Sequence, residues 1–229
     1  MSFLKSDLAN FKDIFHSPRD GQGLFISFEG IEGSGKTTQI TMLEEAIKGQ
    51  GRRVLRLREP GGTEFGEKLR GAILNQGGAP LDPMAETALF VASRAQLLHE
   101  KIIPFLNDPR AVVIVDRYVD STIVYQGEAR GKSTEALWSW HQFAPLNMLP
   151  HFTFFLDIDV DVSLARQAAR GNEKDYFESR HRRFYEGLVR GYRQLAQQFP
   201  DRIKRIDASK NQDEVWQDIS SLLKQQSWL

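Results

Sequence analysis

One segment of nine residues, Gly30 to Thr38, constrains the fold of this chain more than any other feature. It reads Gly-Ile-Glu-Gly-Ser-Gly-Lys-Thr-Thr and matches the phosphate-binding pattern G-x-x-x-x-G-K-[ST]. The apolar run Leu24–Phe28 precedes it, and a helix-compatible stretch from Gln39 to Lys48 follows it. Because the pattern requires this strand–loop–helix setting, the sequence predicts a nucleotide phosphate site between the first strand and the first helix.

The chemistry of the loop explains its residue types. Glycines let successive backbone N–H groups converge on one point, where the N-terminus of the following helix adds partial positive charge. Lys36 is expected to reach the β- and γ-phosphates, and Thr37 to offer its hydroxyl to Mg²⁺. The alternative is a glycine turn that binds no ligand. The residues expected to contact the nucleotide are Gly30, Ile31, Glu32, Gly33, Ser34, Gly35, Lys36, Thr37 and Thr38.

Composition narrows the class of protein. The 229 residues, 41% of them hydrophobic, suit one domain with a sizeable core. Lys+Arg and Asp+Glu both number 30, so no overall basic field favours a nucleic-acid partner. The absence of cysteine excludes disulfides and thiol chemistry. No apolar run approaches the ~20 residues of a membrane span, and the acidic residues of the N-terminus do not suit a targeting peptide, so we expect a cytoplasmic protein.

Short apolar runs alternate with helical patterns along the chain. Near-continuous apolar runs are typical of strands buried on both faces, and each run is separated from the next by enough residues for a helical crossover. The fold class expected is therefore α/β, of the P-loop NTPase type, with a five-stranded parallel sheet wrapped by helices. The five runs are Leu24–Phe28, Val54–Leu57, Ala111–Val115, Phe152–Leu156 and Arg202–Ile206.

Two further stretches bear on domain organisation. Helical spacing after Pro83 predicts one long helix that Pro104 kinks or ends, with an exposed stripe suited to a homodimer. Residues 1–22 form an N-terminal extension, in which an amphipathic helix leads to a linker at Ser17–Gly21. The catalytic domain is then expected to span residues 23–229.

Other segments place polar residues where strands and helices end. Asp116 closes an apolar strand, a common position for a carboxylate that holds magnesium through water, and Arg117 follows within reach of both donor and acceptor phosphates. Glu59 begins a glycine turn at the carboxyl edge of the sheet, where ligands of open α/β sheets bind. Phe90 and Arg94 share a helix face, which suits a stacking ring and a guanidinium. The alternatives are core packing for Phe90 and a solvated charge for Arg94.

Taken together, these motifs resemble thymidylate kinase. The order is Glu-Gly-Ile-Glu-Gly-Ser-Gly-Lys-Thr-Thr, Arg-Glu-Pro-Gly-Gly-Thr, Phe-x-x-x-Arg and Asp-Arg-Tyr, and the resemblance runs from about Leu24 to the end of the chain. It implies the nucleoside monophosphate kinase architecture and the phosphorylation of dTMP to dTDP by ATP and Mg²⁺ in dTTP synthesis. The partners it implies are these small molecules.

The resemblance also assigns roles to residues of the acceptor site. Phe90 would stack on thymine, Arg94 would contact the base and phosphate, and Arg70 with Arg117 would hold the acceptor phosphate. Glu32 matches an acid that orients the acceptor sugar and an arginine. The residues implied to bind dTMP are Glu59, Arg70, Phe90, Arg94, Arg117, Thr122 and Gln126.

The subtype implied is the bacterial one with a basic lid. Some members carry an arginine at the position of Gly33, whereas here Arg166, Arg170 and Lys174 fall in a lid near residues 166–177. The alternative for this stretch is a solvated helix end. The expected catalytic residues are Lys36, Arg117, Arg170 and Glu32. The stretch 177–183 is more basic than the family pattern, and no histidine receives a role.

Two other functions remain open at this stage. One is another nucleoside monophosphate or deoxynucleoside kinase. The other is a nucleotide-binding regulator without turnover, which the presence of Lys36, Thr37, Asp116 and Arg117 disfavours, because only catalysis needs these groups together.

Overall fold

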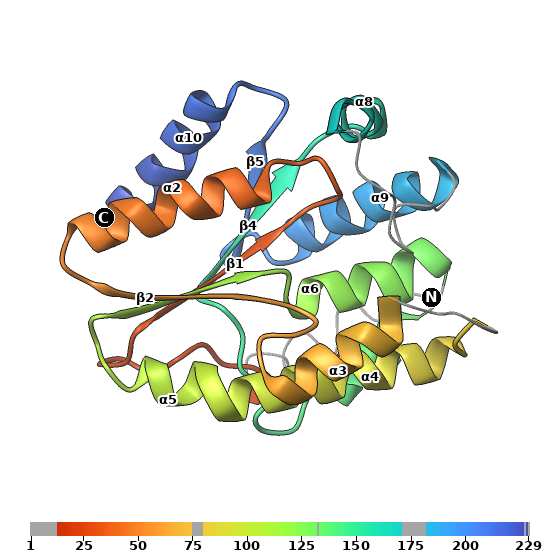
Figure 1. Ribbon diagram of the computed structural model, residues 1–229, viewed down its shortest axis with the longest axis horizontal. Coiled ribbons are helices and arrows are strands. Elements are labelled where there is room, and N and C mark those ends of the chain that lie inside the picture. Colours follow the sequence, from red (N-terminus) through yellow and green to blue (C-terminus); the bar gives the residue numbers. More distant parts are fainter. Residues whose placement is uncertain (1–12, 75–79, 132, 171–181, 227, 229) are drawn as a thin grey trace.

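Five parallel strands form a single sheet with β1 in its centre, and their order is β2-β3-β1-β4-β5 (Figure 1). The computed structural model describes residues 13–74, 80–131, 133–170, 182–226 and 228. The predicted five-stranded parallel α/β fold is confirmed. The strands are β1 Leu24–Glu29, β2 Arg53–Arg58, β3 Ala111–Asp116, β4 Phe152–Asp157 and β5 Ile203–Asp207.

Burial differs between the central and the edge strands. All six residues of β1 are buried, as expected for a strand with helices on both faces. The edge strand β2 departs from this expectation, since Arg53, Arg56 and Arg58 are exposed. Because β2 pairs with β3 alone, its outer side lies at the surface.

Helices cover both faces of the sheet (Figure 1). Helix α2 contacts the strands β1 to β3 and packs beside α10, while α4 and α5 lie on the opposite side. The helical segments are α2 Lys36–Gly49, α3 Glu64–Leu74, α4 Pro83–Leu97, η1 Leu98–Ile102, α5 Ile103–Leu106, α6 Val119–Thr122, η2 Ile123–Gly127, η3 Glu128–Arg130, α7 Thr134–Trp140, α8 Val160–Arg170, α9 Arg182–Gln198 and α10 Gln212–Gln225.

The long helix predicted after Pro83 continues past Pro104. It runs as α4, widens into the π-helical turn η1, and goes on as α5 to Leu106. Proline cannot donate to the carbonyl four residues earlier, and the wider π turn, which ends two residues before Pro104, accommodates this loss. Asp82 caps the start of α4 by accepting from the backbone N–H of Met84 at 2.8 Å.

The N-terminal extension joins the domain core within its described part. Phe15 is 8% exposed and packs edge-on against Trp138, with the ring centroids 5.3 Å apart. Residues 17–21 contain no helix or strand, and Ser17 donates to the carbonyl of Pro150 at 3.2 Å. The predicted amphipathic helix includes Ile14 and Phe15; residues 13 and 14 are helical, and the part before residue 13 lies outside the described residues. Across the described residues, no helix combines the length and apolar character that crossing a membrane requires.

Candidate active site

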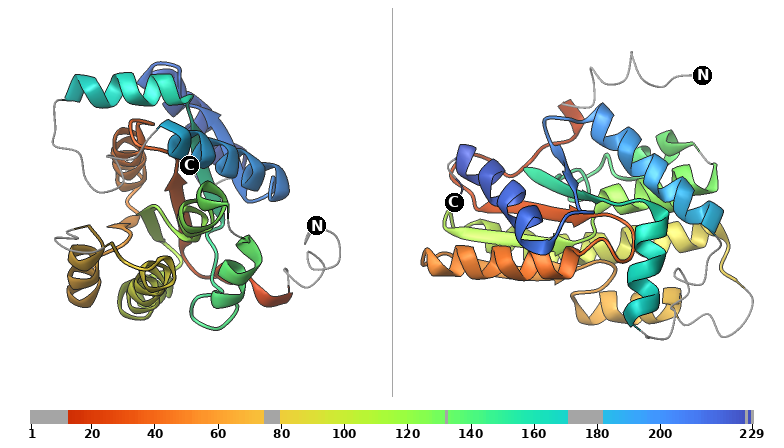
Figure 2. Two further views of the ribbon diagram at one scale, coloured as in Figure 1. Left: turned by 90° about the vertical axis from the view of Figure 1, so that its right-hand side faces the viewer. Right: turned by 90° about the horizontal axis from the view of Figure 1, so that it is seen from above.

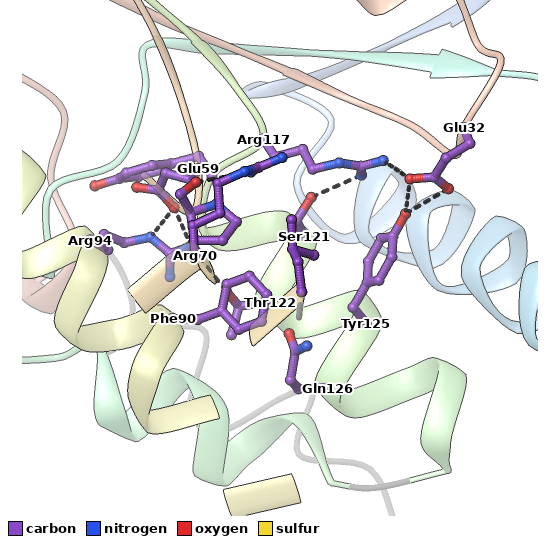
Figure 3. A pocket seen from close by; sticks show the side chains of 13 residues that line it. Glu32, Glu59, Arg70, Phe90, Arg94, Arg117, Ser121, Thr122, Tyr125 and Gln126 are labelled. Atoms are coloured by element: carbon purple, nitrogen blue, oxygen red, sulfur yellow. Dashed lines mark hydrogen bonds and ion pairs between the residues drawn. The ribbon is translucent and has the colours of Figure 1, made fainter. Parts of the chain in front are cut away.

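The carboxyl ends of β1, β2 and β3 meet at one edge of the sheet, where a cleft opens. Apolar side chains and a few polar groups line it together, as is usual in small-molecule sites. The residues predicted to bind the acceptor nucleotide come from four separate segments, and the structure brings all seven together along this cleft (Figure 3). They are Glu59, Arg70, Phe90, Arg94, Arg117, Thr122 and Gln126.

The phosphate loop connects β1 to α2 and depends on its glycines. Gly30 has φ +139°, and a Cβ atom there would lie 2.6 Å from the carbonyl oxygen of Leu156. Gly33 has φ +77°, and its Cβ would lie 3.0 Å from the carbonyl oxygen of Ser163 in α8. Both values of φ disfavour other residues. Helix α8 therefore packs against the phosphate loop at Gly33, the position where some members of the family are expected to carry an arginine.

Lys36 begins α2 and is almost fully buried. Its Nζ atom donates to the carbonyl of Gly30 at 3.1 Å and to that of Ile31 at 3.3 Å. Burial lowers the pKa of Lys36, as does the charge of Arg117, while Asp116 acts in the opposite direction. The lysine is thus held over the loop, in the place that the motif predicts.

The oxygen atoms that would hold magnesium belong to Thr37 and Asp116. Thr37 lies exposed in the first turn of α2, and Asp116 ends β3 beside Phe28 of β1. The Oδ1 atom of Asp116 is buried and has no hydrogen-bond partner among the described residues. Hydroxyl and carboxylate oxygens are the donors that Mg²⁺ prefers, so these residues fit the ion. Among the described residues, no group of three or more His, Cys, Asp or Glu is arranged so that it could hold a metal ion by itself.

Glu32 and Arg117 connect the phosphate loop to the cleft. Arg117 Nη2 donates to Glu32 Oε1 at 2.6 Å, and the Tyr125 hydroxyl donates to the same carboxylate at 3.2 Å (Figure 3). Burial alone would raise the pKa of Glu32, but the charges of Arg117 and Lys36 lower it below its ordinary value. The carboxylate therefore stays ionised and orients the guanidinium.

The backbone of Arg117 is strained. Its φ of +68° makes it the one non-glycine residue with positive φ in the described part of the chain. Its side chain is held as well: the guanidinium lies 5.0 Å from the Tyr125 ring centroid and donates to the Tyr192 hydroxyl at 3.3 Å. Strain of this kind persists only where the surroundings fix the conformation, and it concentrates at functional sites.

Arg94 is 1% exposed, so the alternative of a solvated helix charge is wrong. Its Nε and Nη2 atoms donate to Glu59 Oε2 at 2.8 and 2.5 Å, and Nη2 also donates to the Thr122 hydroxyl at 3.0 Å. Burial raises the pKa of Glu59, while the charge of Arg94 opposes that rise. Because Glu59 balances its charge, Arg94 suits a neutral carbonyl better than a phosphate.

His141, which the sequence analysis left without a role, is the next partner of Arg94. Its Nδ1 atom lies 2.7 Å from the carbonyl of Leu137 and must carry the proton, which leaves Nε2 to accept from Arg94 Nη1 at 2.7 Å. Burial, and then the charge of Arg94, lower the pKa of His141 to about 3. The ring is therefore a neutral acceptor at physiological pH. These bonds leave one N–H of Nη1 for a ligand.

Three other predicted residues complete the cleft. Phe90 is half-buried, so it both packs on the core and presents part of its ring to the cleft. Arg70 donates to the carbonyl of Pro60 at 3.0 Å, which holds it beside the turn after β2. Gln126 is buried and donates through Nε2 to Glu86 Oε1 at 3.0 Å.

The predicted lid is described only in part. Arg166 of α8 donates to the carbonyl of Gly33 at 3.1 Å, which places this helix beside the phosphate loop (Figure 2). The side chain of Arg170 and all of Lys174 lie outside the described residues.

Ser121 and Tyr125 were missed by the sequence analysis, although a signal was present. They are four residues apart, and this spacing sets them on one helical face, where both contact the side chain of Arg117. Glu29 and Tyr192 were also missed. They meet Ser121 from β1 and α9, at 2.5 and 2.8 Å, and no local pattern joins those three segments.

Comparison with known proteins identifies the family. Residues 28–219 match the family model for thymidylate kinase. A thymidylate kinase of Thermoanaerobacter sp. is 41% identical over 203 residues, covering 89% of this chain and 98% of the relative. Those of Anoxybacillus flavithermus and Geobacillus thermodenitrificans are 39% and 42% identical, over 87% and 85% of this chain and 96% and 86% of their own lengths.

Proposed function

The chain belongs to the thymidylate kinase family, and we propose that its cleft transfers the γ-phosphoryl group of ATP to dTMP, giving ADP and dTDP for dTTP synthesis. The observation that carries this proposal is the Glu32–Arg117 ion pair. Glu32 belongs to the phosphate loop and also lines the cleft, so the donor and acceptor sites adjoin at these two residues.

Positioning and charge neutralisation account for most of the catalysis in phosphoryl transfer. Lys36 supplies positive charge on the donor side, and Arg117 supplies it between the donor and the acceptor. Thr37 and, through water, Asp116 would hold Mg²⁺, which neutralises phosphate charge when it is bound. The acceptor is an ionised phosphate, so the reaction needs no general base.

The acceptor nucleotide lies along the cleft in this proposal. Phe90 stacks on the thymine ring, and the remaining N–H of Arg94 donates to a carbonyl of the base. Arg70 and Arg117 hold the acceptor phosphate, and Thr122 and Gln126 border the ring. The pairing of Arg94 with Glu59 supports the base contact over the phosphate contact, since the charge of the guanidinium is already balanced.

The lid completes the donor site in this proposal. Arg166 and Arg170 would bind ATP, and Arg170 would neutralise the γ-phosphate in place of the arginine that Gly33 cannot provide. The contact between Arg166 and the loop supports a donor-side position for α8. A homodimer in the cytoplasm, acting on small molecules without nucleic acid, completes the proposal.

An acceptor screen tests the proposed reaction against another nucleoside monophosphate kinase. ADP release is measured with ATP and dTMP, dUMP, dCMP, dGMP or UMP. We expect dTMP to be strongly preferred and dUMP to be a poor but real substrate, because one methyl group is worth only ~1–3 kcal/mol. Efficient turnover of dGMP would contradict the proposal, and no turnover at all would favour a regulator.

A further inference from the structure

Glu86 of α4 is fully buried next to the cleft, and no role in the reaction has been assigned to it so far. Its Oε1 atom accepts from Gln126 Nε2 at 3.0 Å and from Arg130 Nη2 at 2.5 Å. Its other oxygen, Oε2, is buried with no partner among the described residues. Burying a carboxylate costs free energy, and an ion pair often stabilises no more than apolar residues of similar volume. Packing alone does not explain the presence of this acid.

The carboxylate dictates how the Gln126 amide is turned. A carboxylate paired with an arginine accepts hydrogen bonds and donates none, so the amide must present its NH₂ group to Glu86. The carbonyl oxygen then lies on the other branch of the amide. Figure 3 shows this oxygen on the side of Thr122 and Phe90, in the cleft that Gln126 lines.

The cleft thereby offers a donor and an acceptor at fixed places. The donor is the remaining N–H of Arg94, and the acceptor is the carbonyl of Gln126. A base complementary to both has a carbonyl beside a ring N–H, which is the imide edge of thymine and uracil. Cytosine has an acceptor nitrogen in place of that N–H, and this nitrogen would face the Gln126 oxygen.

We propose that Glu86 is a positioning residue for base selection: anchored by Arg130, it fixes the Gln126 carbonyl toward the cleft, and so favours imide bases over cytosine. This inference rests on the proposed function. It assigns selectivity to a residue that does not itself line the cleft.

The test compares kcat and KM for dTMP, dUMP and dCMP in the parent and in Glu86→Gln. The substituted amide can donate as well as accept, so Gln126 is free to turn over. When the Gln126 amide turns over, its NH₂ group faces the base in place of its carbonyl. We expect the ratio of kcat/KM for dTMP to kcat/KM for dCMP to be roughly tenfold to a hundredfold lower in Glu86→Gln than in the parent. The KM for ATP should stay unchanged, because the donor site is separate.

The matched control is Glu100→Gln. Glu100 lies on the same helical run and also accepts from a glutamine, Gln96, at 3.1 Å, but this bond is exposed. The control should keep the parent's ratio. If folded Glu86→Gln, as judged by its melting curve and ATP KM, also keeps that ratio, the proposal is wrong. A parent without dTMP activity would instead overturn the proposed function.

Glu86→Gln can also be too unstable to assay, and binding to the parent then decides. The ligands are dTMP, dCMP and dTMP methylated at N3, which has lost the imide proton but keeps both carbonyls. The parent should bind the methylated nucleotide and dCMP at least tenfold more weakly than dTMP. Equal binding of dTMP and its N3-methyl derivative would show that no acceptor is fixed at this point, and would overturn the proposal.

Discussion

Arg94 and His141 meet inside the fold with Nη1 and Nε2 separated by 2.7 Å, so a cation faces a histidine that must be neutral. The ring keeps its proton on Nδ1, which donates to the carbonyl of Leu137 in α7, the helix that His141 follows. Four of the five N–H groups of Arg94 are thereby directed by protein oxygen and nitrogen atoms, and the position of the fifth is set.

Removing this acceptor should weaken dTMP binding. In His141→Leu the N–H groups of Nη1 lose their fixed direction, and we expect the KM for dTMP to rise roughly tenfold while the KM for ATP stays constant. His141→Gln provides an acceptor near the position of Nε2 and should recover most of the loss. Steady-state kinetics with both substrates measure this. An equal rise of both KM values would indicate a general packing defect.

Phe90→Ala tests the stacking role. Loss of base stacking costs ~1–3 kcal/mol, so the KM for dTMP should rise at least several-fold with little change in that for ATP. Leu89→Ala is the matched control, because Leu89 is also partly buried against the core but does not line the cleft. If Phe90→Ala melts early and loses ATP affinity as well, the ring serves the core.

Glu29 should make the stability of the fold depend on pH. Burial, and then the charge of Asp120, raise its pKa from 4.5 to about 7. A carboxyl whose pKa is raised on folding contributes stability that is present below pH 4.5 and lost as the pH rises through 7. The comparison variant is Glu29→Gln, whose side chain cannot ionise. Between pH 4.5 and 8, the unfolding free energy of the parent should fall by up to about 3 kcal/mol relative to that of the variant. Denaturant unfolding across this range measures it, and a constant difference would contradict the shift.

The strands and the phosphate loop were predictable because their signals are local. Apolar runs mark β1 and β3, and the spacing of glycine, lysine and threonine marks the loop. Helical spacing and Pro104 also predicted that the long helix kinks or ends near this proline, but they did not predict the π-helical turn η1 that precedes it. Local sequence does not indicate whether neighbouring turns absorb a missing hydrogen bond.

The sequence predicted which residues line the cleft, but it did not predict the hydrogen bonds and ion pairs between them. Helical spacing puts Phe90 and Arg94 on one face, but it cannot show that Glu59, 35 residues away, neutralises the guanidinium. His141 lies 47 residues from Arg94 at the end of another helix, where no motif marks it. The burial that gives these residues their electrostatic properties is a property of the tertiary fold.

The lid arginines should affect turnover more than binding. An arginine that neutralises transition-state charge is worth ~10³–10⁵ in rate, so the combined Arg166→Ala, Arg170→Ala and Lys174→Ala protein should lose at least ~10³ in single-turnover rate. The three single variants show how the loss is shared. Arg182→Ala is the control, because its ion pairs, with Asp161 of α8 and Glu186 of α9, are exposed. A triple variant within about tenfold of the parent, a barrier change under ~1.4 kcal/mol, would make the lid a cover only.

Two substitutions of Arg117 separate the effect of its strained backbone on stability from the effect of its charge on catalysis. Arg117→Ala and Arg117→Gly both remove the partner of Glu32, so this cost cancels when the two variants are compared. Only glycine adopts a φ of +68° without penalty, and the glycine variant should therefore be more stable by about 1 kcal/mol. Both variants should lose at least ~10³ in kcat, since neither places a cation between the two phosphates.

Chemical unfolding and kinetics on the two variants distinguish the outcomes. Equal stability would mean that the backbone relaxes once the guanidinium is gone, in which case the contacts with Glu32, Tyr125 and Tyr192 impose the strain. A more stable but inactive glycine variant would mean that the loop after β3 imposes the conformation by itself. The parent then retains a strained arginine at this position because phosphoryl transfer requires its charge there.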